Sequence, residues 1–333
     1  MPIRSKRKYI KDKITSFEFD FDDLAGSVFE FQYNNNSLYR QYCDYLGRIP
    51  GKINSLENIP FLPISFFKSH EIVSGTFDAE VVFKSSGTTR EQRSQHFVRD
   101  SGLYKTVSIK LFEDVFGDLS QFCILALLPN YLEQGDSSLV YMVDLFIHKS
   151  GNKNSRFFKY NFEELVKETE RLKSKGEKLL IIGVSYALQD LAEKWEIDWH
   201  NHIVLETGGM KGRKKEMLRA ELHDVLGKRF NKMEIGSEYG MTELLSQLYS
   251  KGNGAFDFGQ TIRPLPFEIN DPFTREGPNR VGRCHIIDLA NLDSCSFIAT
   301  EDLCSVNEYD SIKILGRMDH SEVRGCNLLY THS

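Results

Sequence analysis

The sequence predicts an α/β fold with mostly parallel sheets flanked by helices, followed by a β-rich region towards the carboxyl end. Between residues 76 and 250, apolar runs of strand length such as 122–128 and 179–184 alternate with amphipathic segments of helix length. This alternation is typical of parallel sheets covered by helices. After Gly240 the pattern changes, because residues 255–320 are rich in strand and turn signals and show little helical periodicity. We therefore expect a β-rich subdomain packed against the α/β region.

The expected elements follow from the spacing of apolar residues and from turn residues. One helix is expected to begin after Asn161, whose side chain can accept a backbone N–H, with Glu164 three residues on. The other expected helices span residues 100–116, 187–195 and 214–230, and the expected strands span 81–83, 122–128, 178–185, 203–205 and 296–300. No change of composition marks a linker. We expect one domain over residues 1–333, in which residues 1–75 are mostly helical, residues 76–250 form the α/β region and residues 251–333 are β-rich.

Composition narrows the class of protein. The 333 residues are 41% hydrophobic and 27% charged, with a net charge of -5, which suits a globular protein. No apolar run approaches the length of a membrane span, and no apolar signal core follows the basic residues 4–8. We therefore expect a cytoplasmic protein. The basic clusters 4–8 and 211–215 are short and lie in a chain of net negative charge. This charge balance argues against nucleic acid as the main partner.

The cysteines predict neither a disulfide framework nor a zinc site. No two of them have the CxxC spacing of a metal or redox motif. Cys123 and Cys284 lie within expected strands, so we expect small buried core residues there. The six cysteines are Cys43, Cys123, Cys284, Cys295, Cys304 and Cys326.

The first of four motifs is a loop that suits polyphosphate. Glycine lets the backbone approach a ligand closely, and short hydroxyl side chains donate hydrogen bonds without bulk. The loop follows an expected strand and lacks the Gly-Lys-Ser/Thr of a Walker loop. Taken alone, a loop of this composition is more often an ordinary turn. Its residues are Ser85, Ser86, Gly87, Thr88 and Thr89.

The second motif combines residues that suit a nucleotide and a metal ion. It comprises Glu238, Tyr239, Gly240, Met241, Thr242 and Glu243. The ring of Tyr239 can stack on a purine, and the hydroxyl of Thr242 can reach an α-phosphate. Glu243 can hold Mg²⁺, which prefers one or two carboxylates together with phosphate oxygens. The alternative is a strand–turn–helix junction with Thr242 as a cap.

The third and fourth motifs lie in the β-rich region. Asp302, at the end of the expected strand 296–300, can accept the hydroxyls of a ribose. Arg317 and Arg324 can pair with a phosphate or with a carboxylate, since a guanidinium donates in a fork. The alternatives are a turn residue for Asp302 and surface ion pairs for the arginines. In this order, the four motifs point to a site that joins a carboxylate to AMP.

These residues resemble the adenylate-forming superfamily of acyl-CoA synthetases, luciferases and adenylation domains. The chain is most similar to acyl-protein synthetases of the LuxE type, with phenylacetate-CoA ligases as cousins. The superfamily motifs are matched at 85–89, 239–243, Asp302 and 316–325. The LuxE similarity rests on 59–64, 66–68, 288–291, 294–295 and 324–328.

The resemblance implies an adenylate-forming large-domain fold, with ATP and Mg²⁺ as cofactors. A carboxylic acid, most readily a fatty acid, would attack the α-phosphate of ATP to give acyl-AMP, and the acyl group would then move to a thiol. By position, Gly208 and Gly209 would flank the adenine, and Asp319 would be the hinge residue. Cys326 would be the acyl acceptor, as in LuxE-type enzymes. The alternative is an unreactive cysteine, with a reductase or a carrier protein as the acceptor.

Two departures from the superfamily pattern matter. Arg90 stands where the phosphate loop usually has a glycine. The sequence also stops soon after residues 316–325, which match the superfamily's hinge motif. We therefore expect no counterpart of the superfamily's small C-terminal domain with its catalytic lysine. Adenylation would then use Arg317, Arg324 or a basic residue beside the loop, Arg93 or Lys84.

Several questions stay open at this point. His96 and the pair Phe66 and Phe67 are candidates for the substrate end of the site, with core packing as the alternative for the phenylalanines. The chain could also be a CoA ligase of the phenylacetate type, or a non-catalytic acyl- or nucleotide-binding subunit of a larger acyl-transfer complex. Neither the acid nor the final acceptor follows from the sequence.

Overall fold

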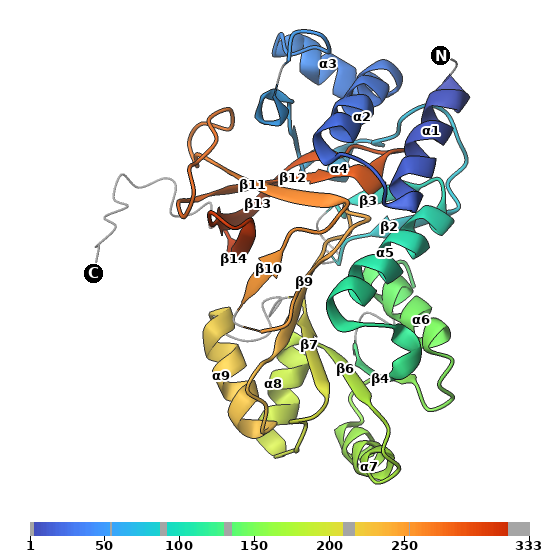
Figure 1. Ribbon diagram of the computed structural model, residues 1–333, viewed down its shortest axis with the longest axis vertical. Coiled ribbons are helices and arrows are strands. Elements are labelled where there is room, and N and C mark those ends of the chain that lie inside the picture. The colour runs from blue at the N-terminus through green and yellow to red at the C-terminus, as the bar shows by residue number, and fades with distance from the viewer. Residues whose placement is uncertain are drawn as a thin grey trace.

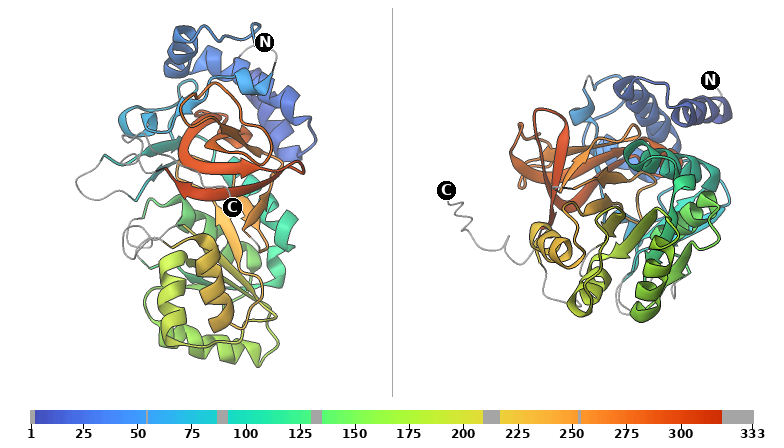
Figure 2. Two further views of the ribbon diagram at one scale, coloured as in Figure 1. Left: turned by 90° about the vertical axis from the view of Figure 1, so that its left-hand side faces the viewer. Right: turned by 60° about the horizontal axis from the view of Figure 1, so that its bottom comes forward.

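The structure is a computed structural model that describes residues 3–53, 55–86, 92–129, 135–208, 217–252 and 254–318. A parallel sheet with its helices forms one end of the molecule, and the N-terminal helices lie at the other (Figure 1). A curved antiparallel sheet, orange to red, lies between these ends (Figure 2). None of the described helices has both the length and the apolar character needed to cross a membrane.

Two of the N-terminal helices, α2 and α3, begin at polar caps. Asp20 accepts hydrogen bonds from the backbone of Asp22 and Asp23 at 3.0 Å, and the side chain of Asn36 caps the next helix at Tyr39. These helices are α1 (Ile3–Ser16), α2 (Phe21–Asn35), α3 (Ser37–Tyr45) and the short α4 (Phe66–Ser69).

The predicted parallel sheet is confirmed. Its strand order is β5-β4-β6-β7-β8-β9, and every neighbouring pair is parallel except β8 and β9. β4 and β6 are buried at every residue, because parallel strands are covered by helices on both faces. The strands are β4 (Cys123–Leu127), β5 (Arg156–Phe158), β6 (Leu179–Val184), β7 (Ile203–Thr207), β8 (Gly236–Tyr239) and β9 (Leu248–Ser250).

The helices around this sheet match the expected ones with two corrections. The expected start of the last helix at residue 214 is wrong, since Met217 and Leu218 are not helical and the carboxylate of Glu221 accepts the backbone N–H of Leu218 at 3.3 Å. α6 was not predicted, because its run of aromatic and β-branched residues hides the helical period. The helices are α5 (Ser101–Phe116), α6 (Ser138–Ser150), α7 (Phe162–Lys173), α8 (Ser185–Lys194) and α9 (Arg219–Arg229).

The expected strand-rich region forms an antiparallel sheet of order β10-β14-β13-β12-β11, and β1 adds to β13 in parallel. A separate hairpin, β2 and β3, flanks the predicted phosphate loop. These strands are β1 (Leu62–Pro63), β2 (Val81–Lys84), β3 (Gln95–Val98), β10 (Ala255–Asp257), β11 (Ile262–Phe267), β12 (Val281–Asp288), β13 (Phe297–Val306) and β14 (Ser311–Arg317).

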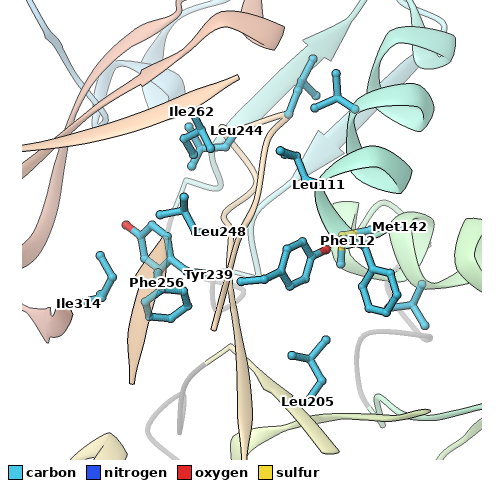
Figure 3. Close-up of a cluster of buried hydrophobic side chains, with 14 of the residues drawn as sticks. Leu111, Phe112, Met142, Leu205, Tyr239, Leu244, Leu248, Phe256, Ile262 and Ile314 are labelled. Atoms are coloured by element: carbon cyan, nitrogen blue, oxygen red, sulfur yellow. Dashed lines mark hydrogen bonds between the residues drawn. The ribbon is translucent and has the colours of Figure 1, made fainter. Parts of the chain in front are cut away.

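One hydrophobic core joins the two large sheets. Side chains from the helix α5, from the parallel sheet and from the antiparallel sheet meet in it, including Leu111, Leu205 and Ile262 (Figure 3). The cysteines within the described residues are buried and free, as predicted for Cys123 and Cys284. Because the core is continuous, it connects β8, which carries part of the second motif, with β13, which carries Asp302.

Candidate active site

A β-bulge places the third motif. The register pairs Arg283↔Leu303 and His285↔Ala299 leave Cys284 alone on β12 opposite residues 300–302 of β13. The hydroxyl of Thr300 donates to the carbonyl of Cys284 at 2.6 Å inside this bulge. The expected strand end at Thr300 is therefore wrong, because β13 continues to Val306. Bulges re-aim side chains beside active sites, and this one aims Asp302.

Asp302 connects the second motif to the fourth. The hydroxyl of Tyr239 donates to Oδ2 of Asp302 at 2.7 Å, and Nε of Arg317 lies 3.7 Å from Oδ1. Arg317 is directly opposite Asp302 on β14, and its side chain is 77% exposed. Gly316, with φ of +109°, lies where the register between β13 and β14 shifts, a backbone conformation that favours glycine. Burial raises the pKa of Asp302, and the Tyr239 hydrogen bond and the Arg317 charge offset part of that rise.

The ring of Tyr239 is mostly part of the core. Tyr239 is 8% exposed, and its ring lies 6.3 Å from the ring of Phe256 at an angle of 64° (Figure 3). Little of the ring is therefore open to a purine in this arrangement. The neighbouring Gly240 is required by packing, because a Cβ atom there would collide with Oε1 of Glu238.

Thr242 and Glu243 follow this strand in a tight turn, with the backbone N–H of Leu244 donating to the carbonyl of Met241 at 3.1 Å. Thr242 is half-buried and Glu243 is 6% exposed. Burial raises the pKa of Glu243, which a hydrogen bond from Ser94 and the charges of Arg317 and Lys68 partly offset. A single carboxylate of this kind could supply one ligand to a Mg²⁺ ion whose other ligands are the phosphate oxygens of a nucleotide.

A buried aspartate, Asp288, accepts hydrogen bonds from the backbone that directly follows this turn. Asp288 is fully buried and accepts hydrogen bonds from the backbone of Leu245 at 2.7 Å and of Ser246 at 3.0 Å. It also accepts from the Ser246 hydroxyl at 2.6 Å and from the backbone of Ala290 at 3.0 Å. Asn291 donates to the carbonyl of Glu243 at 2.7 Å. The sequence singled out segment 288–291 only through the family resemblance, so this supporting role was missed.

Asp288→Ala is expected to lower the free energy of unfolding by more than about 3 kcal/mol, since several buried donors would lose their acceptor at about 1–3 kcal/mol each. Urea unfolding followed by circular dichroism measures this. Asp271→Ala is the matched control, because exposed Asp271 makes the same types of bond, to the backbone of Phe273 and the hydroxyl of Thr274. An unchanged unfolding midpoint for Asp288→Ala would contradict the supporting role.

The hairpin β2–β3 holds Ser85, the first residue of the first motif. The backbone N–H of Ser85 donates to the carbonyl of Ser94 at 3.0 Å, and that of Ser94 donates to the Ser85 hydroxyl at 2.9 Å. Ser86 is exposed. Arg93 donates to both carboxylate oxygens of Asp136, at 2.8 and 3.2 Å, and to the carbonyl of Ser85. Arg93 therefore clamps the hairpin in this structure, and its expected role as a cation on the nucleotide stays a prediction.

Two buried glutamates lie at the carboxyl ends of β7 and β8. Glu206 accepts hydrogen bonds from Ser185 and Ser237, each at 2.8 Å, and pairs with Nε of Arg219 at 2.9 Å. Burial would raise the pKa of Glu206, but His223, Arg219 and Ser185 outweigh it and bring this pKa below its ordinary value. Glu206 is therefore the ionised member of the pair.

Glu238 is the member that keeps its proton to the higher pH. Burial raises the pKa of Glu238 to about 7. The hydrogen bond from Thr207 lowers this pKa, and the charge of Glu206 raises it further. Beside it, Gly208 has φ of +68° and its carbonyl accepts from Ser185 at 3.0 Å. The two glutamates lie beside the end of β7, next to Gly208, which was expected to flank an adenine.

Seven predicted site residues lie outside the described residues, and their roles stay predictions. They are Gly87, Thr88, Thr89, Gly209, Asp319, Arg324 and Cys326.

The fold is that of adenylate-forming ligases. The chain superposes on 2-hydroxyisobutyryl-CoA ligase in complex with 2-HIB-AMP and CoA with a TM-score of 0.63, at 12% identity, over 90% of this chain and 70% of that one. It superposes on ATP-bound MatB from Rhodopseudomonas palustris with a TM-score of 0.53, at 14% identity, over 73% of this chain and 49% of that one. The chain thus spans about half the length of MatB.

The chain belongs to the LuxE family of acyl-protein synthetases, whose family model matches residues 21–332. Two long-chain-fatty-acid–luciferin-component ligases are similar to it. The Aliivibrio fischeri protein is 22% identical over 347 residues, with 92% of this chain and 86% of the relative covered. The Vibrio harveyi protein is 21% identical over 338 residues, with 92% and 85% covered. The predicted fold, family and enzyme class are thus confirmed: a ligase for ATP-dependent acyl activation and transfer to protein.

Proposed function

We propose that this protein activates a long-chain fatty acid with Mg·ATP and transfers the acyl group to a protein thiol. In the first step the carboxylate oxygen bonds to the α-phosphorus while the bond to pyrophosphate breaks, which gives acyl-AMP. In the second step a thiolate sulfur bonds to the acyl carbon while the bond to AMP breaks. The names of the two relatives support a fatty acid as the substrate.

The contact between Tyr239, Asp302 and Arg317 carries this proposal. It joins three motifs that are 63 and 15 residues apart in the sequence into one polar edge, with Glu243 next to the same cation. A carboxylate and an exposed arginine side by side can hold a ribose and a phosphate together. An isolated ion pair would not need the buried tyrosine or the bulge.

Each residue then has a defined task at this edge. Oδ1 of Asp302 would accept a ribose hydroxyl, since Oδ2 is already taken by Tyr239. The Thr242 hydroxyl would donate to the α-phosphate, and Glu243 would hold the Mg²⁺ that neutralises charge on the phosphates. Arg317, which is exposed, would pair with the phosphate or with the attacking carboxylate.

The acceptor that we propose is Cys326. Among the other cysteines, which are all described and buried, burial raises the pKa of Cys43 to about 12 and so suppresses its thiolate. The alternative acceptor is a thiol of a reductase or carrier protein. CoA would replace it only if the enzyme were a CoA ligase.

Pyrophosphate exchange into ATP is expected with hexadecanoate, and less with octanoate, acetate, benzoate or phenylacetate. Radiolabelled hexadecanoate is expected to label the protein as a thioester that hydroxylamine releases. Cys326→Ala is expected to abolish the label and to keep the exchange rate within about twofold, because the acceptor is not used in adenylation. Cys43→Ala, the matched control, is expected to keep both.

The outcomes separate the components of the proposal. If no acid supports exchange, adenylation is wrong. If exchange occurs but the label persists in Cys326→Ala, only the acceptor is wrong. A free acyl-CoA product formed on addition of CoA would identify a CoA ligase instead.

A further inference from the structure

We propose that His96 is a positioning residue that fixes the backbone of Thr242 and Glu243 for adenylation. The sequence singled out His96 as a residue at the substrate end, but the structure gives it another contact. His96 lies on β3 and is 1% exposed, and its Nδ1 is 2.9 Å from the carbonyl oxygen of Thr242. The inference rests on the proposed adenylation at this site.

The hydrogen bond defines the tautomer of His96. A carbonyl oxygen only accepts hydrogen bonds, so Nδ1 must carry the proton, and in the neutral ring Nε2 is then bare. The ring is held edge-on against Phe67, with 6.0 Å between ring centroids and an angle of 85° between planes. Phe67 is itself 1% exposed, so its ring cannot move away from His96 without disrupting the packing of the core.

The two carbonyls of the Thr242–Glu243 dipeptide are held from opposite elements. His96 binds the first carbonyl, and Asn291 donates to the second at 2.7 Å. The side chain of Ser94, two residues before His96 on the same arm of the hairpin, hydrogen-bonds the Glu243 carboxylate. The segment that leads out of the phosphate loop therefore contacts the turn that bears the metal and phosphate residues.

This arrangement does more than bury a histidine. His285 shows the contrast, because it is also 1% exposed, yet both of its ring nitrogens lack a hydrogen-bond partner and its ring stacks on Phe267 at 4.2 Å. His285 is a packing residue. His96 instead uses its one donor on the backbone of the second motif, and a shift of about 1 Å in such a group can cost on the order of 100-fold in rate.

The experiment compares His96→Asn, His96→Gln and His96→Ala in pyrophosphate exchange with hexadecanoate. The amide nitrogen of asparagine can replace Nδ1, whereas that of glutamine lies where Nε2 was. His96→Asn is expected to keep kcat within about threefold of the wild type, while the other two lose about 10- to 100-fold in kcat with KM for ATP changed by less than about threefold. His285→Asn and His285→Gln, the matched controls, are expected to match each other in kcat.

A second measurement does not depend on the variants folding. In the ¹⁵N spectrum of histidine-labelled wild-type protein, His96 is expected as the neutral Nδ1–H tautomer, and an Nε2–H tautomer would overturn the inference. Equal kcat values for His96→Asn and His96→Gln in folded proteins would overturn it as well. Absence of exchange in the wild type would instead overturn the proposed function, and this inference with it.

Discussion

Glu243→Gln is expected to lower the rate of fatty-acid-dependent pyrophosphate exchange by about 100- to 1000-fold. Glutamine keeps the shape of the side chain and can keep the hydrogen bond with Ser94, but it removes the charge that would hold Mg²⁺. The loss is expected in kcat, and higher Mg²⁺ concentrations are expected to restore some of it. The assay is exchange measured across a range of Mg²⁺ concentrations, with the exposed Glu234→Gln as the control for loss of a glutamate charge.

The same variant is expected to be at least as stable as the wild type at pH 8. The folded-state pKa of Glu243 is raised by burial, so its carboxylate costs stability as pH rises above the ordinary value of 4.5. Glutamine cannot ionise and avoids that cost. A large loss of stability in Glu243→Gln would mean that the activity loss reports unfolding, and full activity in a folded variant would rule out Glu243 as the metal residue.

Glu238→Gln is expected to stabilise the protein at pH 8 by about 3 kcal/mol, the second large effect. The folded-state pKa of about 7 exceeds the ordinary value of 4.5, and each unit corresponds to about 1.4 kcal/mol. The protonated carboxyl contributes fully below pH 4.5, and its contribution is lost as pH rises towards and beyond 7. Urea unfolding at pH 5, 6, 7 and 8 measures this: the free energy of unfolding should fall more steeply with rising pH for the wild type than for the variant.

Glu206→Gln is the matched control with the opposite sign. Glu206 is adjacent to Thr207, the hydrogen-bond partner of Glu238, but its folded-state pKa is lowered and it pairs with Arg219. Its contribution is present above pH 4.5 and is lost as pH falls through the folded-state pKa. Removing its charge leaves Arg219 without its carboxylate and is expected to destabilise the protein at pH 8. If both glutamine variants shift the free energy of unfolding in the same direction, the assignment of a raised pKa to Glu238 and a lowered pKa to Glu206 is wrong.

The parallel sheet was predictable because each of its central strands carries its signal locally. β4 and β6 are uninterrupted apolar runs, and α5 begins at the cap Asp100 and keeps an apolar face. β8 was harder to predict, since Gly-Ser-Glu-Tyr is a mostly polar sequence. It is nevertheless buried at every residue, because Ser237 donates to Glu206 and Glu238 accepts from Thr207, and both partners come from a strand 31 residues earlier.

The candidate site divides in the same way. The residue types and their order were enough to choose Thr242, Glu243, Asp302 and Arg317 as candidates. The path of the backbone was not predictable in this way, because the sequence placed Asp302 at the end of a strand. The apolar alternation of β13 breaks at residues 300–302, and nothing in the local sequence distinguishes a bulge from an end. The paired strands β12 and β14 make it a bulge.

By itself, the sequence determined the α/β class, the β-rich region after it, the family and the set of candidate residues, since these depend on local spacing and residue type. Only the tertiary structure decided how these residues work together. It assigned Arg93 to a clamp on Asp136, bound one oxygen of Asp302 to Tyr239, and brought His96 to the carbonyl of Thr242 across 146 residues. It also raised the pKa of Glu238 through burial, while His223 and Arg219 lowered the pKa of Glu206 beside it. The physical reason is that hydrogen-bond partners and burial come from distant segments, which only the packed core brings together.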